Sequence, residues 1–215
     1  MLGIHGFGAY EGREPQGSLP ASRGLTLPEI LIAMAIGSLL LASITSSFMT
    51  QRRIYASREQ VVEAQENVRW GLDTMAREIA MAGCDPTGTS GAGISAASSA
   101  TLQFTMDLNG DGDTDDVNEQ VIYALYDADG DGHQGLGRDT GGGFQLVAEN
   151  IANLSFLYTL ADGTSTPNPA DPGQIREIRV SLTGKTARPD VQYAPNGGYR
   201  TRTLTMAVQM RNMRL

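Results

Sequence analysis

Two short segments with alternating acidic residues hold the side chains of this chain that are best suited to bind an ion. The first places carboxylate or amide oxygens at Asp107, Asn109, Asp111, Asp113 and Asp115. The second does the same at Asp127, Asp129 and Asp131. Both match the opening D-x-[DN]-x-[DN]-G of a calcium-binding loop, in which the glycine permits a sharp turn. The expected chemistry is coordination of calcium, a hard cation that prefers oxygen ligands.

Neither segment places an acid where such a loop normally closes. The twelfth position, which should hold a bidentate carboxylate, is Asn118 in the first segment and Arg138 in the second, and an acid (Glu119 or Asp139) follows one residue later. The alternative is a pair of solvated turns, because Asp-Gly and Asn-Gly favour hairpins. However, the two segments contain eight Asp residues that repel one another. We therefore predict calcium in at least one loop, with the first loop favoured.

A further unusual carboxylate, Glu29, stands at the start of an apolar segment. Residues 30–49 carry no charge over 20 residues, which at about 1.5 Å rise per residue suffices to cross a hydrocarbon core of about 30 Å. An acid beside such a segment is costly unless a partner offsets it, and the expected partner is a positive charge within reach. Residues 1–24 have no apolar core of their own, unlike a secretory signal peptide.

A long helix must position these N-terminal residues. Beyond residue 50, apolar residues recur at spacings of seven, seven, four, three and four, at Ile54, Val61, Val68, Leu72, Met75 and Ile79. This period predicts an amphipathic helix that continues to about Ala82 and is ended by Gly83 and Pro86. Trp70 is expected to pack under a sheet or against a neighbouring subunit.

The rest of the chain is expected to form strands. Apolar and polar residues alternate in five segments, at 102–106, 121–125, 154–158, 178–182 and 204–210, which predicts half-buried strands. Residues 84–100, rich in Gly, Ser and Ala, are expected to be a linker. A helix followed by strands predicts an α+β fold in which an antiparallel β-sheet packs on the amphipathic half of the helix.

Composition excludes several classes of function. The formal net charge is −8 and no basic stripe is present, which argues against nucleic acid as a partner. The single cysteine, Cys84, cannot form an internal disulfide. The two histidines, His5 and His133, give neither a zinc site of the usual ligand count nor a Cys–His pair. We therefore expect the chain not to be an enzyme.

The segment GLTLPEILIAMAIGSLLL, which begins at Gly24, resembles the cleavage and methylation motif of type IV prepilins. In that family a prepilin peptidase cuts after the glycine and methylates the new N-terminal residue. The resemblance implies cleavage between Gly24 and Leu25 and N-methylation of Leu25, where most members have Phe. It also implies that Glu29, five residues past the glycine, pairs with the N-terminal amine of a neighbouring subunit during assembly. Pro28 is compatible with the first turn of a helix.

The strand pattern and residues 175–190 and 202–212 are similar to the PilW family of minor pilins, which is related to the J-type pseudopilins of type II secretion. The resemblance implies a pilin-like fold with four parts. These are a cleaved leader (1–24), a transmembrane and filament-core helix (25–50), an amphipathic helix of the globular domain (51–83), and a periplasmic β-rich pilin domain with two Asp-rich loops (84–215). It also implies a single-pass inner-membrane protein that later enters the pilus at the cell surface. The implied partners are prepilin peptidase, the inner membrane, and other minor pilins or the major pilin through the N-terminal helix.

Three functions follow from these observations. The first is a minor pilin that initiates a type IV pilus or lies at its tip. The second is a J-type pseudopilin of a type II secretion system, and the third is a calcium-dependent adhesion module that uses the pilin helix as an anchor. The charge rule does not decide the orientation in the membrane, because Arg52 and Arg53 follow the apolar segment while Arg13 and Arg23 precede it.

Overall fold

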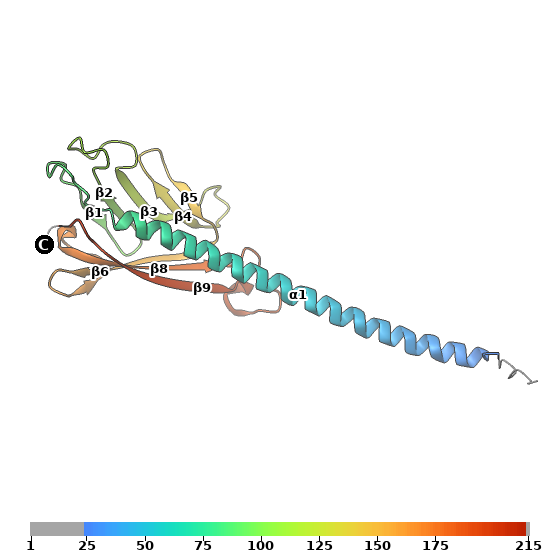
Figure 1. The fold of residues 1–215 in the computed structure, drawn as a ribbon. Helices are drawn as coiled ribbons and strands as arrows, with labels where there is room; N and C mark the ends of the chain where they lie inside the picture. The colour runs from blue at the N-terminus through green and yellow to red at the C-terminus, as the bar shows by residue number, and fades with distance from the viewer. Residues whose placement is uncertain (1–23, 214–215) are drawn as a thin grey trace, which may run out of the picture. The chain divides into compact units, whose positions relative to one another are not determined.

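The computed structural model describes residues 24–213, which form one long helix, nine strands and two short 3-10 turns (Figure 1). The helix α1 spans Leu27–Ile79. The chain divides into two compact units, one up to Thr50 and one from Gln51 onward. α1 contributes residues to both units, and each unit is described by itself below.

Almost every residue of the first unit is exposed. Large apolar side chains such as Leu39 and Leu41 are 70% and 69% exposed, and of residues 24–50 only Gly37 reaches intermediate burial. Within the described part of the chain, α1 is the single helix that is long and apolar enough to cross a membrane. An apolar surface of this extent needs a lipid or protein environment other than water.

The second unit contains two antiparallel sheets. The first has the strand order β1-β2-β3-β4-β5, formed by Ile94–Ala97, Leu102–Thr105, Gln120–Tyr126, Gly135–Asp139 and Gln145–Ala148. The second has the order β7-β6-β8-β9, formed by Ser165–Thr166, Ile151–Leu160, Ile175–Lys185 and Thr201–Gln209. The 3-10 turns η1 (Pro172–Gln174) and η2 (Pro195–Gly198) precede β8 and β9.

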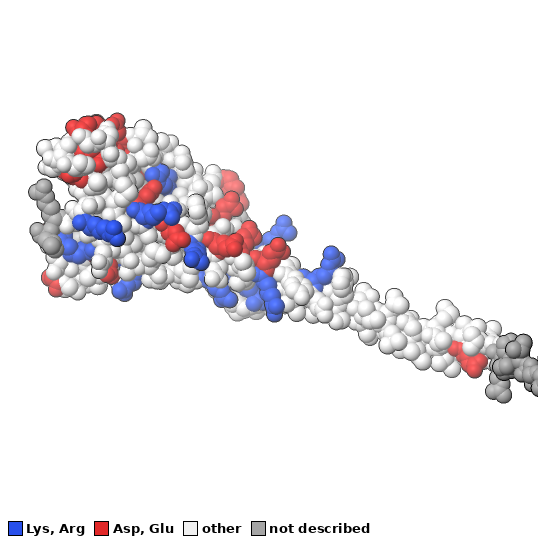
Figure 2. Space-filling view, in the orientation of Figure 1, with Lys and Arg blue, Asp and Glu red and all other residues white. Residues whose placement is uncertain are grey.

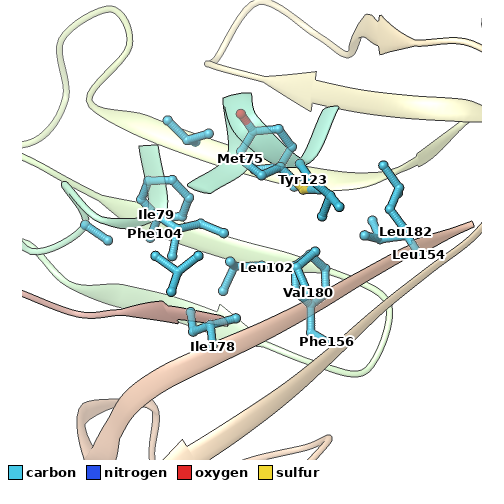
Figure 3. Packing of buried hydrophobic residues seen from close by; sticks show 14 of the residues in the cluster. Met75, Ile79, Leu102, Phe104, Tyr123, Leu154, Phe156, Ile178, Val180 and Leu182 are labelled. Carbon is cyan, nitrogen blue, oxygen red and sulfur yellow. The ribbon is translucent and has the colours of Figure 1, made fainter. Parts of the chain in front are cut away.

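The amphipathic part of α1 packs against both sheets. A Cβ at Gly71 would lie 3.0 Å from Leu136 on β4 and 3.1 Å from Leu182 on β8, so the helix backbone approaches both sheets at this point. Met75 and Ile79 are fully buried one and two turns further along. Figure 3 shows their side chains in one cluster with residues of both sheets. The core of the unit is therefore built from the helix stripe and the inner faces of two sheets.

The predicted fold class is confirmed, and the architecture has two sheets where the sequence predicted one. All five predicted strands are present, and four further ones (β1, β4, β5 and β7) were not predicted. The proposed linker at 84–100 is wrong in part, because β1 lies within it. β4 was missed since its sequence, Gly-Leu-Gly-Arg-Asp, lacks the usual strand formers.

Two details of the helix also differ from expectation. The helix ends at Ile79, and residues 80–83 form a turn that finishes at Gly83 with a positive φ of 73°. Trp70 is 60% exposed, so it does not pack under a sheet. Its position follows from the helical period, because the buried stripe that contains Val68 and Leu72 faces away from it.

The close approach of α1 to β8 gives a direct test of this packing. A Cβ at Gly184 would lie 2.5 Å from Val68 Cγ2 and 2.9 Å from the backbone oxygen of Ala64. Gly184→Ala is therefore expected to lower the free energy of unfolding by about 1–3 kcal/mol, as in other overpacked cores. The measurement is urea unfolding of the full chain in detergent. Gly142→Ala is the matched control, because a Cβ there has no neighbour within 4 Å, and an equal effect of both changes would contradict this packing.

Candidate functional site

The start of α1 is closed by a hydrogen-bonded pair, Thr26 and Glu29. The backbone N–H and the hydroxyl of Thr26 both donate to Glu29 Oε2, each at 2.7 Å. Thr26 also accepts the first helical hydrogen bond, from the N–H of Ile30 at 3.2 Å. A Thr followed three residues later by Glu is a capping box, and a carboxylate in the first turn also favours the helix dipole. The structure thus supplies a local partner for the Glu29 carboxylate.

Neither of these two bonds uses Glu29 Oε1, so the carboxylate keeps an oxygen for another donor. The pairing of Glu29 with the amine of a neighbouring subunit stays a prediction. The capping role of Thr26 was missed at the sequence level, although the Thr-x-x-Glu spacing is itself a recognisable signal.

The peptide bond between Gly24 and Leu25 lies before the helix. Both residues are exposed, Leu25 by 77%, and a Cβ at Gly24 would meet no atom within 4 Å. A non-helical, exposed peptide is suited to enter the active site of a peptidase. The rest of the predicted leader, residues 1–23, lies outside the described residues.

The first acidic loop is closed by two buried carboxylates. Asp107 accepts hydrogen bonds from the N–H of Gly110 at 2.6 Å and of Gly112 at 3.2 Å. Glu119 accepts them from the N–H of Leu108 at 2.8 Å and of Asp116 at 3.3 Å. Asp107 is 0% exposed and Glu119 is 1% exposed. Glu119, which falls one residue past the motif position, therefore ties the two ends of the loop together.

The other predicted ligands of the first loop are exposed. The amide of Asn109 donates to Asp111 at 2.9 Å and to Asp116 at 2.7 Å. Loss of solvent, and then the charges of Asp111 and Glu119, raise the pKa of Asp116. A hydrogen bond and the charge of Asp113 likewise raise the pKa of Asp115. Like charges therefore crowd this loop.

The second acidic loop brings its three carboxylates together. Asp127, Asp129 and Asp131 each offer an oxygen, and these oxygens all lie within 4.8 Å of one another. Asp127 itself accepts hydrogen bonds from Gly130 at 2.8 Å and Gly132 at 2.9 Å, which curls the loop. In the described part of the chain, the acids of the first loop form no such group. The geometry thus favours the second loop, whereas the sequence analysis favoured the first.

A polar cavity of about 300 Å³ lies beside the second loop. Its walls include Asp129, Asp131 and Glu149, together with small apolar residues such as Ala187. Asp129 and Asp131, which are exposed, thus line a cavity beside the loop.

Comparison with known proteins supports the N-terminal resemblance. Residues 19–45 match the family model described as the prokaryotic N-terminal methylation motif. No curated protein matches the chain. Among solved structures, the chain is similar to a type IV-like pilin from Thermus thermophilus, with 13% sequence identity and a TM-score of 0.47 over 70% of this chain and 98% of that one.

The motif match confirms the predicted resemblance to prepilins for this N-terminal segment. The motif marks the substrate of a processing peptidase, which is a role for a structural protein and not for an enzyme. The exposed apolar helix suits a membrane anchor that can also pack in a filament.

The buried position of Glu119 predicts a structural role that is independent of any metal. Glu119→Gln should lower the free energy of unfolding by about 1–3 kcal/mol, because a backbone N–H loses its charged acceptor. The measurement is urea unfolding in the presence of EDTA. Asp115→Asn, an exposed change in the same loop, should leave stability nearly unaltered. If Glu119→Gln were neutral in EDTA, Glu119 would not be holding the loop closed.

Proposed function

We propose that this chain is a minor pilin of a bacterial type IV pilus, similar to the PilW family. It is cut by prepilin peptidase between Gly24 and Leu25 and methylated on the new amine of Leu25. It is held in the inner membrane by residues 25–50 with its sheet domain in the periplasm. It then joins the major pilin or other minor pilins in a complex that initiates the filament or forms its tip.

The observation that carries this proposal is the methylation motif at residues 19–45. Three features of the structure support it. The Gly24–Leu25 peptide is exposed and precedes the helix, the apolar face of the first unit lacks cover, and Glu29 retains Oε1 for an external donor. In an assembled filament that donor is the N-terminal amine of a neighbouring copy of Leu25 or its equivalent.

The J-type pseudopilin of a type II secretion system is the nearest alternative, because the same processing serves both assemblies. Deletion of the gene separates the two. Loss of surface pili with normal protein secretion supports the minor pilin, whereas loss of secretion with normal pili supports the pseudopilin.

The proposal is tested by intact mass and N-terminal sequencing of the chain from native membranes, with and without the prepilin peptidase. The expected product begins at methylated Leu25 and disappears when the peptidase is absent. Gly24→Ala should block cleavage. A Cβ at this position meets no other atom of the chain within 4 Å, so the effect of the substitution would arise in the active site of the peptidase and not from a change in the fold. Glu29→Gln should be cleaved but fail to enter filaments.

Gly37→Ala is the matched control, since Gly37 also has no neighbour within 4 Å and lies outside the cleavage site. It should be cleaved normally. An uncut chain in wild-type cells, or a cut at another position, would reduce the apolar helix to a simple anchor and end the proposal.

We also propose that the second acidic loop binds calcium. The convergence of Asp127, Asp129 and Asp131 within 4.8 Å supports it, because three oxygens at this spacing suit a hard cation. The adjacent cavity leaves room for water or for a hydroxylated ligand at the ion. This is the observation that favours the adhesion module as a second function of the same domain.

Calcium binding is expected to raise the melting temperature of the full chain by roughly 5 °C at millimolar calcium relative to EDTA, for a dissociation constant near 10 μM. The double variant Asp127→Asn/Asp131→Asn should lose this shift. Asp111→Asn/Asp113→Asn, which removes the same charge from the first loop, should keep it. If the first-loop variant loses the shift instead, calcium binds the first loop, as the sequence analysis favoured. Equal melting temperatures in EDTA and in calcium would refute calcium binding altogether.

A further inference from the structure

One end of the second unit carries a charge opposite to that of the rest. Residues 51–60 and 185–202, called here the basic end, hold seven Lys or Arg and two Asp or Glu, a formal charge of +5. Residues 61–184 hold five basic and nineteen acidic residues, a formal charge of −14. Figure 2 shows several blue side chains where the amphipathic part of α1 begins, with red ones beside them, and a dense red cluster at the other end of the same unit. The acidic chain thus carries a locally basic surface.

Hydrogen bonds between its two segments build the basic end. The backbone N–H of Arg188 donates to Gln60 Oε1 at 3.3 Å. The Ser57 hydroxyl donates to Asp190 Oδ2 at 3.4 Å, and Arg200 pairs with the same carboxylate oxygen at 3.0 Å. These bonds seat the loop before β9 on the side of α1. Residues 133 and 128 positions apart in the sequence therefore contribute to one surface.

Most of the basic side chains of this surface remain exposed. Exposed Arg residues come from both segments: Arg52, Arg53, Arg58, Arg188 and Arg202. Exposed apolar residues lie among them, with Val191 fully exposed at the loop, Tyr55 68% exposed and Ile54 46% exposed. Arginine combined with aromatic and aliphatic side chains is typical of a membrane–water interface.

The covalent structure holds this surface near any membrane that the first unit occupies. Gln51 follows directly on the uncharged segment of residues 30–50. Ser57 and Gln60, to which the loop is bonded, lie about 9 and 14 Å of helix rise beyond Gln51. The headgroup layer is about 5–7 Å thick, and the Debye length at physiological salt is about 8 Å. This short tether therefore brings the arginines of the basic end within reach of lipid phosphates.

We propose that the basic end is a docking surface for the headgroups of anionic phospholipids. The arginines contact lipid phosphates while Val191 and Tyr55 enter the interfacial layer. The surface holds the sheet domain against the bilayer until the chain is drawn into an assembly. An acidic protein could also neutralise the arginines. However, its binding would not depend on the covalent link to the membrane anchor or on the exposed apolar residues. The inference rests on the membrane anchor of the proposed function and is independent of pilus assembly.

The test is hydrogen exchange of the full chain in nanodiscs of phosphatidylcholine, with and without about one third phosphatidylglycerol. Amides of residues 186–200 should exchange about tenfold more slowly in the anionic discs. This slowing should vanish at about 0.5 M salt, where the Debye length is about 4 Å. The turn at residues 161–164, at the far end of the second sheet, should exchange equally in both discs.

Charge variants decide whether the basic end causes the slowing. Arg188→Gln/Arg202→Gln should weaken docking by roughly 25-fold, because each basic residue near an anionic surface contributes about fivefold. Arg179→Gln/Arg211→Gln removes the same charge from elsewhere on the unit and should behave as wild type. Equal exchange in the two discs, or equal loss in both variants, overturns the proposal. Because the assay needs neither cleavage nor filaments, a failure here differs from a failure of the proposed function.

Discussion

Burial of one helix stripe between two sheets is the interaction on which the rest of the second unit depends. Met75 and Ile79 are fully buried, and each such side chain contributes about 1.5–3 kcal/mol when removed from water. Gly71 lets the helix approach both sheets at once, and Gly184 lets β8 pass close to Val68 and Ala64. Side chains at either glycine would force the layers apart, so the position of both sheets is coupled to one face of α1.

A half-buried polar contact joins the helix to the first sheet at the edge of this core. Glu78 Oε2 accepts hydrogen bonds from the Tyr123 hydroxyl at 2.6 Å and from Arg138 Nε at 2.9 Å. Burial and the neighbouring Glu78 raise the pKa of Tyr123 well above its usual range, so this hydroxyl remains a donor. Arg138 lies on β4, the strand that the sequence analysis did not predict. Its pairing with Glu78 explains why a charged residue of this strand points toward the helix.

Acidic and basic residues gather in different parts of the chain. The acidic loops lie at the ends of strands of the first sheet, and the basic residues lie where the chain leaves its apolar segment. In the first loop Asp107 and Glu119 turn their oxygens toward backbone N–H groups, so the backbone satisfies Asp107, which the sequence analysis assigned to a cation. Asp127 of the second loop accepts the equivalent pair of N–H bonds from Gly130 and Gly132, and there three carboxylates also converge. Two segments with the same motif thus share one turn and differ in whether their carboxylates gather.

Local patterns in the sequence determined the long helix, its apolar and amphipathic parts, five of the strands and the motif at Gly24 to Glu29, because each depends on residues close together in the chain. The tertiary structure alone decided the division into two sheets, the strand β4 and the half-buried pair of Glu78 and Arg138, since these depend on contacts between distant segments. It also decided which acidic loop gathers its carboxylates and that residues 57–60 meet residues 188–190. A hydrogen bond across 128 or 133 residues leaves no periodic signal in the sequence, and for that reason the basic end could be found only in the folded chain.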